Sequence, residues 1–471
     1  YQIPLSFLPL EAAHEFLAER PQSVLLQYQS EKQEGLIYDA VWDVSFRQTL
    51  LQLIARKKTI SALSGRLKPY TGRYFKKVRN LISTIEHSQP LTAEQSNSSI
   101  LYNRKLILKL FRKLDEGTNP DLEITRYLSE KTDFEHAPAF AGALEYQKKD
   151  NSVITLGILS PFIANEGSAW DLAHHYTIRY FEKVLAQLSQ LEKLPFLPDS
   201  MLEKTEKDMP DEMQELIEVP FLEMVSLLGK RTAELHNALG RKTQQEDFKA
   251  ESFSTLYQRS ISQSLQSLVK RVFRSLKRSY SQYPDTVQEE IQKVLSLEST
   301  ITAYSQEIAS QKLAAQKIRI HGDYHLGQVL YTGNDFYIID FEGEPARPLG
   351  IRRLKRSPLK DVAGMLRSFY YAAFNPLIQK KITGDYHELE HWGHLWVLYV
   401  SRVFLKAYLE QIEPALVPKE SSELKRLLNI YLLEKAVYEV WYEMENRPDW
   451  LSIPLKGVLF EVNKINSEKE V

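Results

Sequence analysis

Two aspartates and a glutamine occur within residues 318–345 at spacings that suit the transfer of a phosphoryl group. Asp323 follows a short apolar stretch, Gln328 comes five residues later, and Asp340 ends the next apolar stretch. One carboxylate can orient an attacking hydroxyl and accept its proton. A second carboxylate and a neutral amide oxygen can hold Mg²⁺ on the phosphates of ATP. The pattern therefore predicts Asp323 as the catalytic base and Gln328 and Asp340 as metal ligands.

The same order and offsets occur in protein kinases, where a catalytic Asp is followed by an Asn five residues on and then by the Asp of a DFG segment. Gln328 stands in place of the Asn, and Gly322 stands in place of the Arg that precedes the kinase Asp. A lone His-Gly-Asp tripeptide more often places its aspartate in a turn cap. We favour catalysis because the amide and the second aspartate both follow at the expected positions.

Lys109 is the residue that we expect to position the phosphates of ATP. It lies in the β-rich run 106–111, and a kinase lysine of this kind is held by a glutamate of the following helix. Glu123, in the helix that begins near Asn119, is the predicted partner. A surface lysine on an edge strand is the alternative.

The loop before this strand, residues 94–99, is polar and has no glycine. Its hydroxyl and backbone N–H groups can still meet phosphate oxygens, and Ser96 is the expected contact, with a plain polar turn as the alternative. We expect the adenine-binding hinge near residues 160–163. Pro161 cannot donate a backbone hydrogen bond there, so its neighbours must supply the contacts.

Aromatic and charged residues recur on one face of the helix predicted at 420–446. Their steps of four and three place them on that face: Tyr431, Lys435, Tyr438, Tyr442 and Glu445. Such a stripe combines the ring faces and hydrogen-bonding groups that a sugar site needs. Spacing alone leaves open whether it is a sugar site or the edge of a core, which is the more frequent case.

Several segments of the chain resemble the maltokinases, a family of aminoglycoside-phosphotransferase-like kinases, and the likeness extends over nearly the whole chain. The segments that carry it are 321–330, 339–348 and 357–369, with further likeness at 94–99, 108–112, 433–436 and 446–450. The resemblance implies transfer of the ATP γ-phosphate to the anomeric hydroxyl of maltose. The products would be maltose 1-phosphate, which feeds α-glucan synthesis, and ADP.

The resemblance also assigns residues to the acceptor side. It implies that maltose contacts Lys435, Tyr438, Tyr442 and Arg447. His321 and His325 flank the base, and we expect them to contact acceptor or phosphate, with packing of the loop as the alternative. Asp361 is expected to order the catalytic loop. Members of the family often occur fused behind a trehalose synthase, so such a fusion or complex is an implied partner.

The fold class that we predict is α+β, as a bilobal protein-kinase-like fold of the aminoglycoside-phosphotransferase type. Residues 1–90 would form an α/β cap domain, 91–167 a small β-containing nucleotide lobe with the hinge, and 168–471 a large helical lobe with the catalytic and sugar sites. Strands are expected at 24–29, 35–41, 106–111 and 152–159. Helices are expected at 46–55, 170–192, 207–239, 252–283, 286–316, 358–377, 391–411 and 420–446.

Composition argues against several other classes of function. The 471 residues carry a net charge of -1 and no cysteine, which argues against nucleic-acid binding and excludes disulfides and thiolate chemistry. The basic segment 66–79 is expected to be solvated surface. The apolar stretch 396–409 is broken by two cations and too short to span a bilayer, so we expect no membrane partner. The absence of cysteine fits a reducing cytosol, so we expect a cytoplasmic location.

Two rival functions stay open at this stage. A kinase of another sugar or an aminosugar would share the same catalytic residues. A pseudokinase module that binds nucleotide or scaffolds a trehalose synthase would be expected to lack Asp323, Gln328 or Asp340, and all three are present. The chain begins at Tyr1, so both a trimmed chain and a piece of a longer polypeptide are compatible with it.

Overall fold

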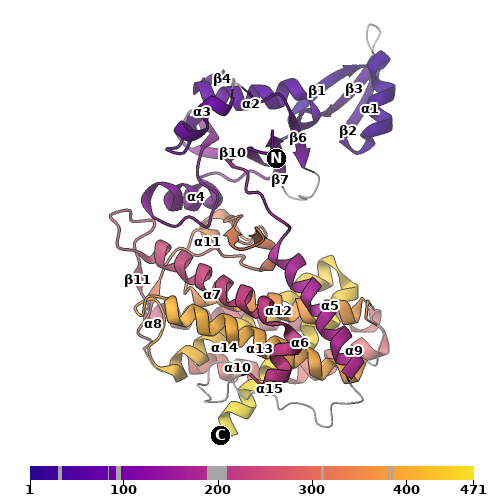
Figure 1. Cartoon of the computed structure of the whole chain (residues 1–471), viewed down its shortest axis with the longest axis vertical. Coiled ribbons are helices and arrows are strands. Elements are labelled where there is room, and N and C mark those ends of the chain that lie inside the picture. The colour runs from indigo at the N-terminus through magenta and orange to yellow at the C-terminus, as the bar shows by residue number, and fades with distance from the viewer. Residues whose placement is uncertain are drawn as a thin grey trace. The chain divides into compact units, whose positions relative to one another are not determined.

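The computed structural model describes residues 1–29, 34–82, 84–91, 97–187, 209–308, 312–379, 381–382 and 386–470. The chain forms two compact units (Figure 1). Unit 1 contains Tyr1–Ala164 together with Asp340–Arg353, and unit 2 contains Asn165–Ile339 and Leu354–Val471. The short segment Asp340–Arg353 therefore belongs with the N-terminal part of the chain, although it lies far away in sequence.

Unit 1 is built on a seven-stranded antiparallel sheet in the order β4-β5-β9-β10-β8-β7-β6. The strands are β4 Ile60–Ala62, β5 Gly65–Thr71, β6 Ser88–Leu91, β7 Asn97–Tyr102, β8 Leu106–Phe111, β9 Gly142–Lys148 and β10 Val153–Pro161. Two helices, α2 (Val44–Arg56) and α3 (Phe75–Ile82), share a hydrophobic core with Leu106, Leu108 and Leu110 of β8. Because side chains alternate along a strand, Lys109 points to the opposite face.

A smaller antiparallel sheet in unit 1 has the order β1-β3-β2. Its elements are β1 Leu5–Pro9, α1 Ala13–Glu19, β2 Val24–Gln29 and β3 Glu34–Asp39. The boundary predicted at residue 90 is wrong, because β4 and β5 precede it and yet pair into the same sheet as β9 and β8. The sheet is continuous across that boundary through the pairing of β5 with β9.

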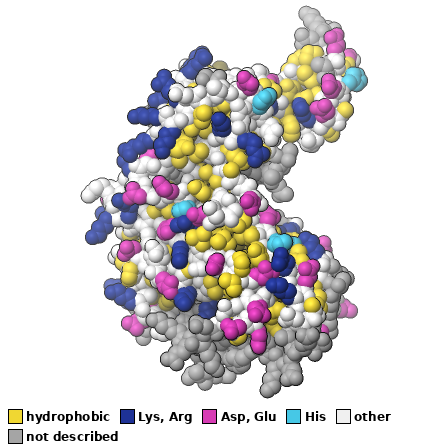
Figure 2. All heavy atoms as spheres, viewed as in Figure 1, with side chains coloured by type: hydrophobic (Ala, Val, Ile, Leu, Met, Phe, Trp, Pro, Cys, Tyr) yellow, Lys and Arg dark blue, Asp and Glu magenta, His cyan; other side chains and the backbone are white. Residues whose placement is uncertain are grey.

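Two helices complete unit 1, α4 (Pro120–Lys131) and the short α11 (Leu349–Arg352). The basic residues of the segment 66–79 are all exposed, as predicted for solvated surface. Lys and Arg side chains gather over α3 and β4 in Figure 2.

Unit 2 is mainly helical. Its helices are α5 Ala169–Gln187, α6 Asp211–Ile217, α7 Val219–Gly240, α8 Thr255–Ser279, α9 Asp285–Ser296, α10 Glu298–Glu307, α12 Leu359–Ile378, α13 Tyr386–Gln411, α14 Ser421–Asn446 and α15 Ser452–Glu470. The helix α12 is buried along most of its length and packs against α5, α13, α14 and α15 (Figure 1). Two small antiparallel pairs are β11 Glu251–Ser252 with β12 Gln316–Lys317, and β13 Val329–Tyr331 with β14 Phe336–Ile338.

Most predicted helices of this unit are present, with three differences. The helix expected at 207–239 is divided into α6 and α7 at Glu218, whose φ of 76° ends the first helix. The helix expected at 286–316 is divided into α9 and α10 at Leu297. The terminal helix α15 was not predicted. No helix among the described residues has an apolar span long enough to cross a bilayer.

Candidate active site

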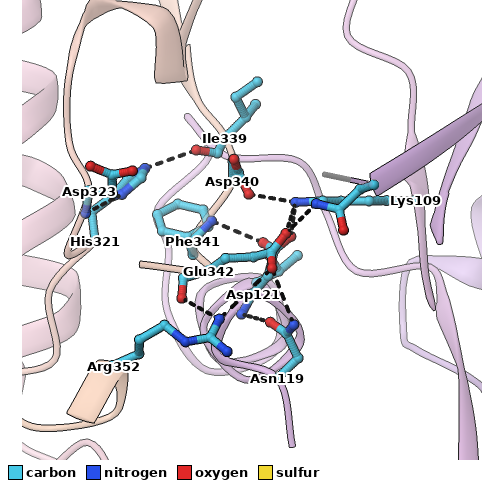
Figure 3. Close-up of polar contacts among 12 residues, drawn as sticks. Lys109, Asn119, Asp121, His321, Asp323, Ile339, Asp340, Phe341, Glu342 and Arg352 are labelled. Carbon is cyan, nitrogen blue, oxygen red and sulfur yellow. Dashed lines mark hydrogen bonds and ion pairs between the residues drawn. The ribbon is translucent and has the colours of Figure 1, made fainter. Parts of the chain in front are cut away.

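The ammonium group of Lys109 binds three carboxylates of unit 1 (Figure 3). Its Nζ lies 3.0 Å from Asp121 Oδ2 and 2.8 Å from Glu342 Oε1, and it also donates to Asp340. Burial alone would lower the pKa of Lys109, but the three carboxylates raise it well above its ordinary value. Lys109 is therefore a fixed cation, as a phosphate-binding lysine must be.

The predicted partner of Lys109 was Glu123, and this prediction is wrong. Asp121, two residues earlier on α4, holds the lysine instead, while Glu123 pairs with Arg353 at 2.8 Å. Residues two apart on a helix point in widely different directions, so only one of the two acids can face β8. The buried positions Asp121, Thr125 and Leu128 recur at steps of four and three. This period in the sequence could have identified Asp121.

Asp121 also orders the segment that delivers Asp340. Its Oδ1 accepts a hydrogen bond from the backbone N–H of Phe341 at 3.1 Å, and its own N–H is capped by Asn119 at 2.8 Å (Figure 3). Asp340 has a φ of 66°, a left-handed conformation that a non-glycine residue adopts at a cost of about 1–3 kcal/mol. The contacts to Phe341 and Lys109 hold the backbone in this conformation.

Glu342 is the second acidic residue of this segment, and sequence analysis did not single it out. Besides Lys109, it accepts hydrogen bonds from Asn97 at 2.6 Å and from Asn119 at 3.5 Å. Burial and the neighbouring carboxylates Asp340 and Asp121 raise its pKa. The aspartate-x-glutamate pattern at 340–342 was the available signal for its role.

The donor set of this cluster fits a divalent cation. Oxygen atoms of Asp121, Asp340 and Glu342 lie within 4.8 Å of one another. Three carboxylates face the ammonium group of Lys109, and Arg352, which also pairs with Asp115, lies 3.9 Å from Glu342. These carboxylates outnumber the two cations, and carboxylate oxygens are the ligands that Mg²⁺ prefers. Asp340 is the most accessible of the three, with 31% of its side chain exposed, because the other two are held by neighbouring side chains.

The loop that carries Asp323 is ordered by the buried Asp361 of unit 2. Asp361 Oδ2 accepts from the backbone N–H of His321 at 2.7 Å, and Oδ1 accepts from that of Gly322 at 2.9 Å. Burial would raise the pKa of Asp361, but hydrogen bonds from His236 and Gly322 lower it overall. The predicted role of Asp361 in ordering this loop is confirmed.

The two histidines of the loop have structural contacts. His321 is 1% exposed, and its Nε2 lies 2.9 Å from the carbonyl oxygen of Ile339, the residue before Asp340 (Figure 3). A buried ring cannot contact an acceptor, so the substrate role predicted for His321 is wrong and the packing alternative holds. His325 Nδ1 accepts from Gly327 N–H at 3.1 Å and caps the short 3₁₀ turn Leu326–Gln328.

Gln328 ends that turn. Its backbone carbonyl oxygen accepts from Ile339 N–H at 3.0 Å, which places Gln328 beside the residue that precedes Asp340.

Two further predictions concern the nucleotide side. Ser96, the predicted phosphate contact, lies outside the described residues. In the segment 160–163, which we predict as the hinge, Phe162 N–H donates to the carbonyl oxygen of Lys105 at 2.9 Å.

One residue of the stripe on α14, Lys435, lies beside Asp323. Lys435 Nζ lies 3.7 Å from Asp323 Oδ1 and 5.3 Å from the ring centre of Tyr438. The rings of Tyr438 and Tyr442 are 6.4 Å apart, and Tyr442 is 38% exposed. Tyr431, at the start of the stripe, is buried in the core. The accessible part of the stripe is therefore Lys435, Tyr438, Tyr442 and Glu445.

Arg447 follows this helix and stacks on aromatic rings. Its guanidinium lies 4.2 Å from the ring centre of Trp450 and 5.4 Å from that of Tyr442. The buried Glu443 binds it at 2.7 Å and also accepts from the Tyr371 hydroxyl at 3.1 Å. Glu443, which sequence analysis did not single out, fixes the direction of Arg447.

Known proteins resemble this chain in structure over most of its length and in sequence over a part of it. No family model matches the chain. A glucosamine kinase of Streptacidiphilus jiangxiensis is 27% identical over 139 residues, 29% of this chain and 30% of that protein. One of Mycolicibacterium smegmatis is 29% identical over 135 residues, 28% of this chain and 32% of that protein. The matches thus span about a third of each curated relative.

A solved structure covers much more of the chain. A glucosamine kinase in complex with glucosamine, ADP and inorganic phosphate has a TM-score of 0.61 and 16% sequence identity, and the alignment covers 92% of this chain and 86% of that one. This likeness confirms the predicted α+β, bilobal kinase-like fold.

Proposed function

We propose that the protein is an ATP-dependent sugar kinase. The observation that carries the proposal is the pairing of Lys109 with Asp121 and Asp340, in a chain whose second unit holds Asp323 on an ordered loop beside Lys435. A fixed lysine, a metal-binding carboxylate and a separate base are the parts that phosphoryl transfer requires. The kinase-like fold and the glucosamine kinases among the similar proteins support the same class.

In the proposed reaction, Asp323 orients the acceptor hydroxyl and accepts its proton as the oxygen attacks the γ-phosphorus. The bond between the γ-phosphorus and the β,γ-bridging oxygen breaks, and ADP leaves with the electron pair. Lys109 binds the phosphates, with Ser96 as a further phosphate contact. Asp340 and Gln328 would hold Mg²⁺, which when bound neutralises charge on the phosphates.

We propose maltose as the acceptor, phosphorylated at its anomeric hydroxyl. Lys435, Tyr438, Tyr442 and Arg447 offer ring faces and charged hydrogen-bond donors to a neutral disaccharide. His325, on the loop of Asp323, is half-buried and is proposed as a further acceptor or phosphate contact.

Glucosamine is the second candidate, because the similar kinases are named for it. It is an ammonium sugar near neutral pH, and Lys435 would repel it beside the base. Three glutamates of α14 already bind cations: Glu434 binds Lys360, Glu439 binds Arg367 and Glu443 binds Arg447. The cation that this helix places beside Asp323 therefore favours the neutral sugar.

A trehalose synthase, fused or in complex, is the partner that we propose as the source of maltose. In that case this protein should not phosphorylate trehalose alone. It should form maltose 1-phosphate when trehalose is supplied together with a trehalose synthase.

The test is ADP release from Mg²⁺-ATP with maltose, glucose, glucosamine, trehalose or no sugar. Activity with one sugar, lost about 10²–10⁴-fold in Asp323→Asn, would support the kinase. The exposed Asp285→Asn of the same unit is the matched control and should behave as wild type. ATP binding without ADP release across the panel would favour the pseudokinase.

A further inference from the structure

The helix α7 carries two fully buried side chains, Thr232 and His236, which lie one turn apart. Thr232 contacts the loop of Asp323 directly, and His236 contacts Asp361, which holds that loop. The hydroxyl of Thr232 donates to the carbonyl oxygen of Leu228 at 2.8 Å, as a helical threonine often does. The same oxygen lies 2.8 Å from the hydroxyl of Tyr324. Since its one proton is used for Leu228, Thr232 accepts the hydrogen bond that Tyr324 donates.

His236 reaches the other side of the loop through Asp361. Its Nε2 lies 3.2 Å from Asp361 Oδ2, and because an ionised carboxylate only accepts, Nε2 carries the proton. Its Nδ1 lies 3.0 Å from the hydroxyl of Tyr408 on α13, which fixes the ring plane. Asp361 in turn accepts from the N–H groups of His321 and Gly322.

These two chains of contacts end on the residues directly before and directly after Asp323. Gly322 is held by Asp361, and Tyr324 is held by Thr232. The loop has little room to move toward α12, because a Cβ atom on Gly364 would lie 2.5 Å from the carbonyl oxygen of Tyr324. Both neighbours of Asp323 are therefore held by contacts that lead to α7, directly from Tyr324 to Thr232 and through Asp361 of α12 from Gly322 to His236.

We propose that Thr232 and His236 are positioning residues that hold Asp323 in line for attack. The proposal rests on the proposed function of Asp323 as the base. A displacement of about 1 Å in a reacting group can cost about 10²-fold in rate, so loosening either contact lowers kcat. It leaves the KM for ATP nearly unchanged, because the contacts of Lys109 with Asp121 and Glu342 lie within unit 1.

Thr232→Val and Tyr324→Phe remove the same hydrogen bond from its two ends. We expect each to lower kcat about tenfold, and the double variant to be no slower than the slower single one, since coupled residues are not additive. Thr177→Val is the matched control, because Thr177 is equally buried and bonds the carbonyl oxygen of Ala173 at 2.7 Å. It should keep the wild-type kcat. Additive losses, or an equal loss in the control, would overturn the proposal.

For His236, glutamine can replace the Nε2 donor and phenylalanine cannot. His236→Gln should retain most of the kcat, and His236→Phe should lose about tenfold or more. Equal loss in both would show that the ring only fills space and would contradict the proposal.

Hydrogen exchange of the loop amides in 318–326 tests the same contacts without a sugar. Exchange should accelerate in Thr232→Val and His236→Phe and remain slow in Thr177→Val. Unchanged exchange in the first two variants would overturn the proposal. If wild type released no ADP with any sugar while exchange changed as expected, the proposed function would fail and the positioning contacts would stand.

Discussion

At the scale of single residues, the balance of charge around Lys109 governs how variants should behave. One ammonium group faces Asp121, Asp340 and Glu342, and further contacts hold Asp121 and Glu342 in place. Removing one of them changes the direction of the lysine as well as the charge. Removing one carboxylate should therefore change the affinity for ATP more than it changes the free energy of unfolding.

The two acids of α4 provide a matched pair. We expect Asp121→Asn to raise the KM for ATP about tenfold. Lys109 loses a charged partner, and the N–H of Phe341 then donates to a neutral amide oxygen, which is a weaker acceptor than the carboxylate. Glu123→Gln should stay within twofold of wild type, since Glu123 binds Arg353. Steady-state kinetics with varied ATP measure both. A larger rise in the KM for ATP in Glu123→Gln than in Asp121→Asn would indicate that Glu123 is the partner of Lys109 after all.

Lys435 decides between neutral and cationic acceptors in this account. Lys435→Met should shift the ratio of kcat/KM for glucosamine over maltose toward glucosamine by about tenfold, because a like charge beside the base is removed. The exposed Lys419→Met, just before α14, is the control and should leave the ratio unchanged. A ratio that does not move in Lys435→Met would mean that this cation does not select the acceptor.

The residue types and order of Asp323, Gln328 and Asp340 could be recognised in the sequence because the chemistry fixes their offsets. The choice between Asp121 and Glu123 could not be made from the kinase layout alone, because it depends on which side of α4 faces the sheet. His321 was open between two roles for the same reason. Its ring is buried, and its partner, the carbonyl oxygen of Ile339, lies 18 residues away in the sequence.

At the scale of elements, α2 shows how a local sequence signal is stabilised by packing. Asp43 caps the helix, and its carboxylate accepts from Ser45 N–H at 2.8 Å and from the Ser6 hydroxyl at 2.8 Å. Burial would raise its pKa, but these hydrogen bonds lower it overall. The helix then packs Leu50, Leu51 and Ile54 into the core of unit 1.

We expect Asp43→Ala to lower the free energy of unfolding by about 1 kcal/mol, and Asp43→Asn to lower it by less, because asparagine also caps helices. Since the folded pKa lies below the ordinary value of 3.8, the carboxylate stabilises the fold fully above that pH. The contribution is lost as pH falls through the folded pKa. Urea unfolding at pH 7 and pH 3 measures both effects, and a difference between wild type and Asp43→Ala that does not shrink at pH 3 would contradict this account.

Elements with a strong local pattern were predictable, such as β2 at 24–29 and β8 at 106–111, whose bounds agree with the expectation. Of the two breaks within predicted helices, the one at Glu218 is marked by Pro220, whereas the other is not marked. The division at Leu297 between α9 and α10 has no proline or glycine to mark it, and it follows from packing against different neighbours.

At the scale of the whole molecule, the division of the chain was the hardest feature to predict. The pairing of β5 with β9 joins residues 65–71 to 142–148, and no local pattern reports a contact at that separation. The segment Asp340–Arg353 belongs to unit 1 through contacts of the same long range. The sequence could indicate a β-containing part and a helical part. It could not indicate that a segment from the second half of the chain belongs to unit 1.

Nucleotide binding should stabilise the chain through unit 1. At about 100 times its dissociation constant, Mg²⁺-ATP should add about 2.7 kcal/mol to the free energy of unfolding, seen as a higher Tm by calorimetry. Asp340→Asn should lose most of this shift, and so should wild type with EDTA in excess. A Tm shift that persists in Asp340→Asn would mean that this carboxylate does not help to hold Mg²⁺-ATP.

The central claim is that Asp323 directs the γ-phosphate of ATP onto the anomeric hydroxyl of a sugar. The most direct measurement is a ³¹P NMR time course with Mg²⁺-ATP and maltose. The account predicts that a new phosphate ester signal, coupled to the anomeric proton, grows in step with ADP in wild type and is absent in Asp323→Asn. A phosphate ester at another position of the sugar, release of inorganic phosphate alone, or equal product from the variant would contradict it.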